Sequence, residues 1–139
     1  MKGRVSWVEG GRFLAESGSG HALPMSAKIL GDESGVAPSP MEYVLLGTGG
    51  CSCVDVVHIL SKGRHDVRDC CVLLDAERAP EDPKVFTHIH MHFVVTGKNL
   101  KPEAVGRAVE LSAEKYCSAS IMLAKTAKIT HDFEVKDTE

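Results

Sequence analysis

The pattern of apolar and polar positions begins with a stretch typical of β-structure. Val5 and Trp7 alternate with polar neighbours, Gly10 and Gly11 form a turn signal, and an extended pattern then resumes. This pattern predicts a β-hairpin, and a Gly/Ser-rich turn separates it from a third strand and a loop. The predicted ranges are 4–9 and 12–15 for the hairpin strands, 23–30 for the third strand and 31–38 for the loop.

A long apolar segment follows this loop. Ser39, Pro40 and Glu42 suit the N-cap, the first helical position and the third helical position of a helix. From 43 to 60 nearly every residue is apolar or small, and Gly63 then supplies a stop signal. We therefore predict a central buried helix that is covered on most of its sides.

The second half of the chain returns to extended patterns. The stretches 69–78 and 85–96 are rich in β-forming residues and are joined by a segment with two prolines, which predicts a long antiparallel hairpin. Pro102 then begins a second, amphipathic helix that runs toward Cys117.

Two short elements complete the predicted order: a helical turn over 120–124 and a closing strand over 128–135. The order is three strands, a helix, two strands, a helix and a strand, without strand–helix repeats of the parallel type. Neither an internal repeat nor a linker interrupts it. We predict an α+β fold in which residues 1–139 form one domain.

Charge and hydropathy exclude some classes of partner. The 139 residues include 16 Lys and Arg and 19 Asp and Glu, a net charge of −3, and no dense basic cluster. A nucleic-acid partner is not expected from this balance. No uninterrupted run of 18 apolar residues occurs and the start lacks a secretory pattern. We expect a soluble cytoplasmic protein without a membrane partner.

The five cysteines are an odd number, which favours reduced thiols over a disulfide framework. Cys51 and Cys53 are separated by one residue, and Cys70 and Cys71 by none, so no Cys-x-x-Cys spacing is present. Cys53 points away from Cys51 on a helix, and adjacent strand residues such as Cys70 and Cys71 face opposite sides. Cys51 and Cys117 are either a functional pair or small buried apolar residues.

Two cysteine-containing motifs settle this choice by resemblance. Ser39-Pro40-Met41-Glu42 followed by Gly49-Gly50-Cys51-Ser52, together with Ala113-Glu114-Lys115-Tyr116-Cys117-Ser118, resembles the two motifs of the OsmC/Ohr family. Further matches make the chain similar over nearly its whole length to the YhfA-like branch of that family, and they lie at 7–10, 62–64 and 86–89. The resemblance implies an OsmC-like fold and an intertwined homodimer.

The resemblance also implies a chemistry. Cys51 is the peroxidatic cysteine, which attacks the O–O bond of an organic hydroperoxide, and Cys117 is the resolving cysteine. A sulfenic acid at Cys51 condenses with the second thiol and so avoids irreversible oxidation. A dithiol reductant, unknown for this chain, completes the cycle, and no metal or organic cofactor is needed.

The family activates its peroxidatic thiolate with an Arg on the early hairpin and a Glu near the helix start. Arg12 occupies a hairpin position that corresponds to this Arg. Met41 stands ten residues before Cys51, where the family has the Glu, and Glu42 is the neighbouring candidate. Asp55, one helical turn after Cys51, raises a thiol pKa unless a cation pairs with it.

Other functions remain open beside peroxide reduction. One is a non-catalytic OsmC-like stress protein that binds another small apolar molecule. Another is a metal-binding module that uses His88, His90 and His92, which alternate along one strand. A solvated strand face explains this row more simply. We interpret His58 and His131 as structural or surface residues, because no third residue marks a Cys–His hydrolase.

Overall fold

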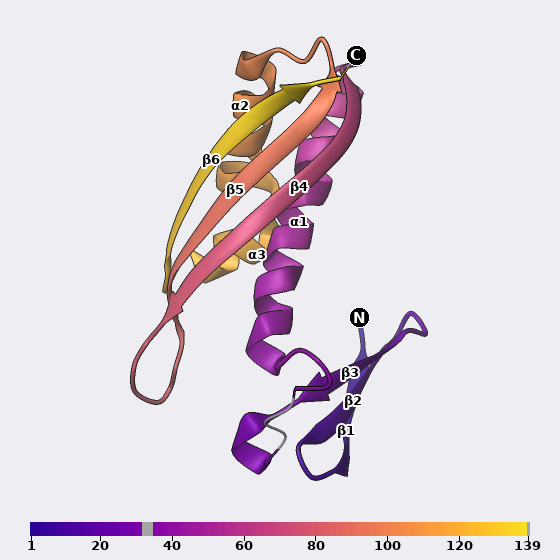
Figure 1. Cartoon of the computed structure of the whole chain (residues 1–139), viewed down its shortest axis with the longest axis vertical. Helices are drawn as coiled ribbons and strands as arrows, with labels where there is room; N and C mark the ends of the chain where they lie inside the picture. The colour runs from indigo at the N-terminus through magenta and orange to yellow at the C-terminus, as the bar shows by residue number, and fades with distance from the viewer. Residues whose placement is uncertain (32–34, 139) are drawn as a thin grey trace. The chain divides into compact units, whose positions relative to one another are not determined.

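The structure, a computed structural model, describes residues 1–31 and 35–138 (Figure 1). Its contacts form two compact units, Met1–Val44 and Leu45–Glu139, and the division falls within the long helix. Each unit contains its own three-stranded sheet. Part of the loop predicted over 31–38 lies outside the described residues.

The first unit is built on the predicted hairpin. Strand β1 (Gly3–Glu9) pairs antiparallel with β2 (Arg12–Ser17), which pairs antiparallel with β3 (Ala22–Ser26). Gly10 adopts a φ of 52° at the first turn, a conformation that glycine tolerates without steric cost. The predicted meander at the start of the chain is confirmed.

The prediction of a strand over 23–30 is wrong at its second half. The β3 strand ends at Ser26, whose N–H donates to Pro38 O, while the N–H of Ala27 donates to Gly11 O. These bonds take the backbone out of the β2–β3 ladder, and Lys28–Leu30 forms the 3₁₀ turn η1 instead. Sequence alternation alone does not report such a change of backbone partner.

Helix α1 (Pro40–Lys62) begins with the predicted capping box. The Glu42 N–H donates to Ser39 Oγ over 3.2 Å, and the Ser39 N–H donates to Glu42 Oε1 over 3.0 Å. Two N–H groups that have no partner within the helix are satisfied in this way. The helix start is therefore fixed by its own local sequence.

The second unit contains a mixed sheet of order β4–β5–β6. The long hairpin of β4 (Asp66–Arg78) and β5 (Phe86–Lys98) is confirmed, whereas β6 (Lys128–Asp137) runs parallel to β5. The α+β class is confirmed, and this single parallel pair is one crossover connection that the predicted element order did not identify. Three helical segments make the crossover: α2 (Pro102–Leu111), η2 (Ser112–Tyr116) and α3 (Ser118–Leu123).

Within the second unit the helices lie on one face of this sheet (Figure 1). A methyl group added at Gly49 would lie 2.7 Å from Leu74 Cδ1 and 3.2 Å from Val72 Cγ1, so the absence of a side chain lets α1 approach β4 closely. The buried positions of α1 share this sheet-facing side, and they are Thr48, Gly49, Ser52, Val56 and Leu60.

The opposite side of α1 is open in the single chain. Val54 is 67% exposed and Val57 is 37% exposed, so the prediction of a helix covered on most sides is wrong within one chain. By length and composition α1 is also apolar enough to cross a membrane, a property that the core helix of a soluble protein shares.

Candidate functional site

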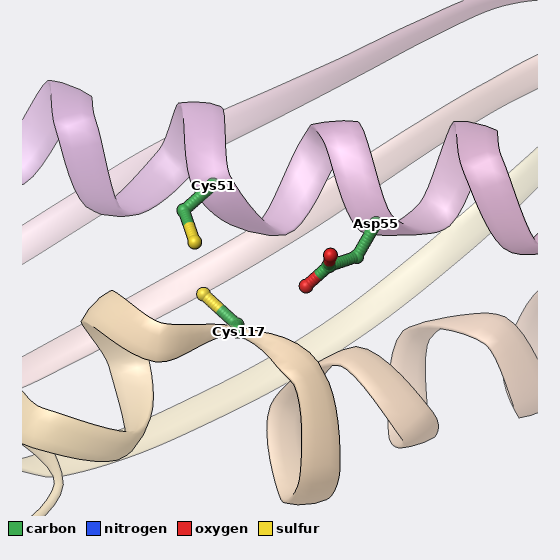
Figure 2. Close-up of side chains that lie close together, drawn as sticks. All are labelled: Cys51, Asp55 and Cys117. Carbon is green, nitrogen blue, oxygen red and sulfur yellow. The ribbon is translucent and has the colours of Figure 1, made fainter.

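The structure brings Cys51 and Cys117 together although 65 residues separate them in the sequence. Cys51 comes from the middle of α1 and Cys117 from the residue between η2 and α3, and their sulfurs point toward each other (Figure 2). The two sulfurs and a carboxylate oxygen of Asp55 all lie within 4.8 Å of one another. Cys51 is half-buried, whereas Cys117 is completely buried.

A turn of π-helix positions Cys117. The Cys117 N–H donates to Ser112 O over 2.8 Å, a bond that spans five residues instead of the four of an α-helix. Such turns are rare and occur frequently at functional sites. The chain then turns at Cys117, whose backbone is extended, before α3 begins.

Hydrogen-bond donors surround the sulfur of Cys117. The Ser52 hydroxyl donates to it over 3.1 Å, and the Ser120 N–H donates over 3.4 Å. Burial raises the pKa of the Cys117 thiol, but Ser120, Ser52 and the neighbouring Cys51 outweigh burial and hold this pKa below its usual value. The arrangement therefore favours a thiolate at Cys117.

Cys51 is affected in the opposite direction. The backbone of Ala119 lowers the pKa of Cys51, but burial and the adjacent Cys117 sulfur raise it, and the net direction is upward. The two directions together favour the thiolate at Cys117 over the thiolate at Cys51.

Asp55 is the third member of the cluster. It lies one turn after Cys51 on α1, is half-buried, and its Oδ2 accepts a hydrogen bond from the Ser112 hydroxyl over 3.1 Å. Among the described residues of the second unit, no Lys, Arg or His forms an ion pair with this carboxylate. The sequence placed Asp55 on the face of Cys51, and the structure adds its contact with Ser112.

A second pair of cysteines lies at the contact of α1 with β4. The Cys53 thiol donates to Cys70 O over 3.4 Å and also contacts the Cys70 sulfur. Burial, followed by the contact with Cys53, raises the pKa of Cys70 to about 12. Cys70 is therefore a thiol at neutral pH, and its neighbour Cys71 is exposed on the other face of the strand.

Arg12 and Glu42 belong to the first unit. Arg12 is exposed on β2, where it lies opposite Ser26. Glu42 is exposed at the start of α1, and the hydrogen bonds from the Ser39 backbone and hydroxyl hold the pKa of Glu42 below its usual value. Its carboxylate is therefore engaged in capping the helix.

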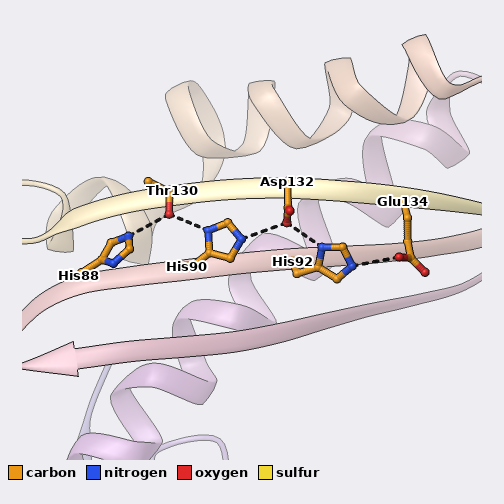
Figure 3. Close-up of polar contacts among 6 residues, drawn as sticks. All are labelled: His88, His90, His92, Thr130, Asp132 and Glu134. Carbon is orange, nitrogen blue, oxygen red and sulfur yellow. Dashed lines mark hydrogen bonds and ion pairs between the residues drawn. The ribbon is translucent and has the colours of Figure 1, made fainter.

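The histidine row lies on the sheet face that is turned away from the helices, alternating with buried Ile89, Met91 and Phe93. Figure 3 shows that both ring nitrogens of His90 and His92, and Nε2 of His88, are hydrogen bonded to side chains of β6. The bonds run from His88 through Thr130, His90, Asp132 and His92 to Glu134, over 2.7 to 3.3 Å. The row is thus a polar network between neighbouring strands.

The remaining candidate histidines, His58 and His131, are both exposed. Sequence reasoning did not identify Ser52, Ser112 and Ser120, although all three are buried and supply the hydroxyl or N–H donors of the site. Ser52 adjoins Cys51, and its position in the Gly-Gly-Cys-Ser motif was the one available signal.

The second unit is an α+β unit in which two helical segments bring a buried and a half-buried cysteine together, as expected for an OsmC-like protein. A family model described as OsmC-like protein matches residues 31–132, and the chain belongs to this family. The expectation of an OsmC-like fold is confirmed.

Individual relatives cover nearly the whole chain. Protein YhfA of Escherichia coli strain K12 is 58% identical over 135 residues, which are 97% of this chain and 98% of the relative. A crystal structure of a hypothetical protein from Aquifex aeolicus VF5 is 31% identical, covers 99% of this chain and 97% of its own, and has a TM-score of 0.86. The organic hydroperoxide resistance protein OhrB of Bacillus subtilis is 15% identical, with coverages of 96% and 98% and a TM-score of 0.66, a likeness of fold alone.

Proposed function

We propose that this protein is a thiol peroxidase that reduces organic hydroperoxides, with Cys51 as the peroxidatic and Cys117 as the resolving cysteine. The observation that supports it is the position of the two sulfurs within 4.8 Å, one half-exposed and the other buried. An external oxidant reaches the half-exposed sulfur first, so the two cysteines take different roles. Membership of the OsmC-like family supports a function in stress response.

The proposed cycle balances as two linked steps. The Cys51 sulfur attacks the terminal oxygen of the hydroperoxide, the O–O bond breaks, and an alcohol leaves with a proton while Cys51 becomes a sulfenic acid. The Cys117 sulfur then attacks the Cys51 sulfur, a disulfide forms between them, and the sulfenic oxygen leaves as water. A dithiol of another molecule reduces this disulfide by exchange and is itself oxidised.

The hydrogen bonds to the Cys117 sulfur suit the resolving step of this cycle. The first step requires Cys51 to lose its proton against the upward shift of the Cys51 pKa, so this sulfur needs a cation beside it. After the sulfenic acid forms, Cys117 is again the sulfur that its donors stabilise as a thiolate. A thiolate is the species that attacks in the resolving step.

Arg12 and Glu42 complete the proposed site by analogy with the family. In this proposal the Arg12 guanidinium stabilises the Cys51 thiolate, and Glu42 assists by orienting the cation in addition to capping α1. Arg12→Lys keeps the charge but loses the planar fork of donors. We expect it to slow hydroperoxide reduction while thermal unfolding is unchanged.

The proposal includes a soluble, cytoplasmic homodimer made of OsmC-like domains that each span 1–139. The exposed apolar side of α1, with Val54 and Val57, favours burial against a second copy. Substitution of Val54 by Lys is expected to shift the sedimentation equilibrium toward the monomer. An unchanged dimer would place the interface elsewhere.

Reduced, metal-free protein treated with cumene hydroperoxide, and separately with hydrogen peroxide, tests the activity. We expect each chain to consume one equivalent of the organic peroxide and to lose two thiols. The Cys51→Ser variant should be inert, and the Cys117→Ser variant should stop with one added oxygen on Cys51, detectable by intact mass.

The Cys53→Ser variant is the matched control, because Cys53 lies on the same helix and contacts Cys70. It should retain the wild-type rate. If wild-type protein loses thiols no faster than Cys51→Ser, the peroxidase proposal fails, and binding of a small apolar molecule becomes the better account of the family fold.

A further inference from the structure

The proposed peroxidase cycle gives no role to the carboxylate of Asp55, which lies beside the thiol pair. Cys51 and Asp55 project from successive turns of α1 toward the segment that carries Cys117 (Figure 2). One ligand atom from each residue lies within 4.8 Å of the other two. A carboxylate beside a reactive thiol raises the thiol pKa, so this placement opposes thiolate formation in the absence of a cation.

The cluster collects negative charge without a side-chain counter-ion in its own unit. In the described part of the second unit, no Lys, Arg or His forms an ion pair with Asp55. The donors that contact the cluster are neutral serine hydroxyls and backbone N–H groups. Grouped anionic ligands of this kind are stabilised when they are paired or coordinate a metal.

We propose that reduced Cys51, Cys117 and Asp55 form a binding site for a thiophilic divalent cation of the Zn²⁺ type. Two thiolates and one carboxylate are a ligand set that Zn²⁺ accepts, with a fourth position left for water. Each thiol releases its proton to solvent when its sulfur coordinates the metal. This inference goes beyond hydroperoxide reduction and does not depend on it.

The distances suit such a site after a small movement. Zn²⁺ binds sulfur at about 2.3 Å and carboxylate oxygen at about 2.0 Å, which places tetrahedral ligand atoms roughly 3.5 to 3.8 Å apart. The ligand atoms of the cluster lie within 4.8 Å, so side-chain rotations of about 1 Å close it. The half-buried Cys51 leaves the cluster accessible to a cation from solvent.

The surroundings already orient the ligands. The Ser112 hydroxyl donates to Asp55 Oδ2 over 3.1 Å and thereby orients the carboxylate. The Ser52 hydroxyl and the Ser120 N–H hold Cys117. Outer partners of this kind fix ligand orientation and change metal affinity about 10- to 100-fold when they are removed.

Metal binding and disulfide formation would use the same two sulfurs. A cation held by Cys51 and Cys117 withdraws both thiolates from an oxidant, and an oxidised pair cannot bind the cation. The metal-loaded and disulfide states therefore exclude each other. This gives the site a second reduced state besides the free dithiol.

Cobalt titration of reduced, chelator-treated protein without a His-tag tests the site, followed by competition with Zn²⁺. We expect one Co²⁺ per chain with a thiolate-to-cobalt charge-transfer absorption, which Zn²⁺ removes. The Cys51→Ser variant should lose this absorption. Asp55→Asn should weaken the affinity at least about tenfold, and Ser112→Ala about 10- to 100-fold.

Two variants serve as controls for competing ligands. Cys53→Ser removes the cysteine two residues from Cys51, and His90→Gln removes the central histidine of the outer row. Both should bind Co²⁺ as the wild type does. Circular dichroism and thermal unfolding of each variant separate loss of the site from loss of the fold.

Absence of the charge-transfer absorption in folded wild-type protein would overturn the inference. It would also be overturned if Cys51→Ser kept the absorption, or if His90→Gln abolished binding. The hydroperoxide assay on metal-free protein is independent of these outcomes. A negative titration with retained peroxide turnover rejects the metal site alone, and the reverse pattern rejects the peroxidase alone.

Discussion

Two cysteine pairs of this protein share helix α1 and differ in chemistry. Cys51 and Cys117 meet among neutral donors that lower the pKa of Cys117, whereas Cys53 and Cys70 meet at a helix–sheet contact where the pKa of Cys70 rises to about 12. Both pairs bring sulfur close to sulfur. Proximity of the sulfurs is therefore common to both pairs, and directed hydrogen bonds to one sulfur distinguish the pair of Cys51 and Cys117.

The largest expected effect is selective disulfide formation. Treatment of reduced protein with diamide at neutral pH should link Cys51 to Cys117 in nearly all chains and Cys53 to Cys70 in almost none, because exchange requires a thiolate. Peptide mapping by mass spectrometry measures both links. Equal rates for the two pairs would remove the distinction drawn between them.

A second test concerns the packing that surrounds the unreactive pair. Gly49→Val places methyl groups against Leu74 and Val72 of β4, and we expect a loss of about 1–3 kcal/mol in the free energy of unfolding. Gly47→Val is the matched control, since nothing lies within 4 Å of a side chain begun there. Urea unfolding of both variants gives the difference, and equal losses would show that Gly49 has no packing role.

The third test removes a donor from the reactive pair. Ser52→Ala deletes the 3.1 Å hydrogen bond to Cys117, so the pKa of Cys117 rises toward its usual value. In metal-free protein the midpoint of thiolate ultraviolet absorption against pH should move to higher pH, with a smaller thiolate fraction at neutral pH. Cys53→Ser should leave this midpoint unchanged. If Ser52→Ala also leaves it unchanged, the Ser52 hydroxyl does not lower the pKa of Cys117.

The smallest effect is expected on the far face of the sheet. Asp132, followed by Glu134, raises the pKa of His92, while His92 and His90 hold the pKa of Asp132 below its usual range. The stabilisation from protonated His92 is complete below the pKa of unfolded histidine and is lost as pH rises through the folded value. Asp132→Asn should lower the His92 midpoint in an NMR titration.

The same variant should not move the thiolate absorption midpoint of Cys117, because the row and the thiols lie on opposite faces of β5. A shift in both midpoints would mean that the environment of the reactive pair extends through the sheet. In acid the contribution of Asp132 disappears as pH falls through its folded pKa, which is the opposite direction to the loss at His92.

Much of the fold was predictable because its signals are local. The capping box at Ser39 and Glu42 marks the start of α1, and strand alternation marks both sides of the long hairpin. The parallel pairing of β6 with β5 was not predictable in this way. The direction of a strand depends on how the crossover packs against the sheet, and alternation is the same for either direction.

The site was also predictable only in part. The family motifs brought Cys51 and Cys117 into consideration, and helical spacing put Asp55 on the face of Cys51. Ser112 and Ser52 act on partners 57 and 65 positions away, contacts that no local pattern encodes. The regular spacing of the histidine row suggested a metal site on a strand. The ligand atoms that converge in the structure belong instead to Cys51, Asp55 and Cys117, on two helical segments.

The π-turn before Cys117 makes this site sensitive to chain length. Five residues, Ser112–Tyr116, fill a turn that closes with a bond spanning five positions. Removal of one residue would restore α-helical phase and rotate Cys117 by about 100° around the helix axis. The sulfur would then leave the direction of Cys51, although every side chain of the site was still present. An insertion or deletion in this turn would therefore separate the Cys117 sulfur from Cys51 more than a substitution would.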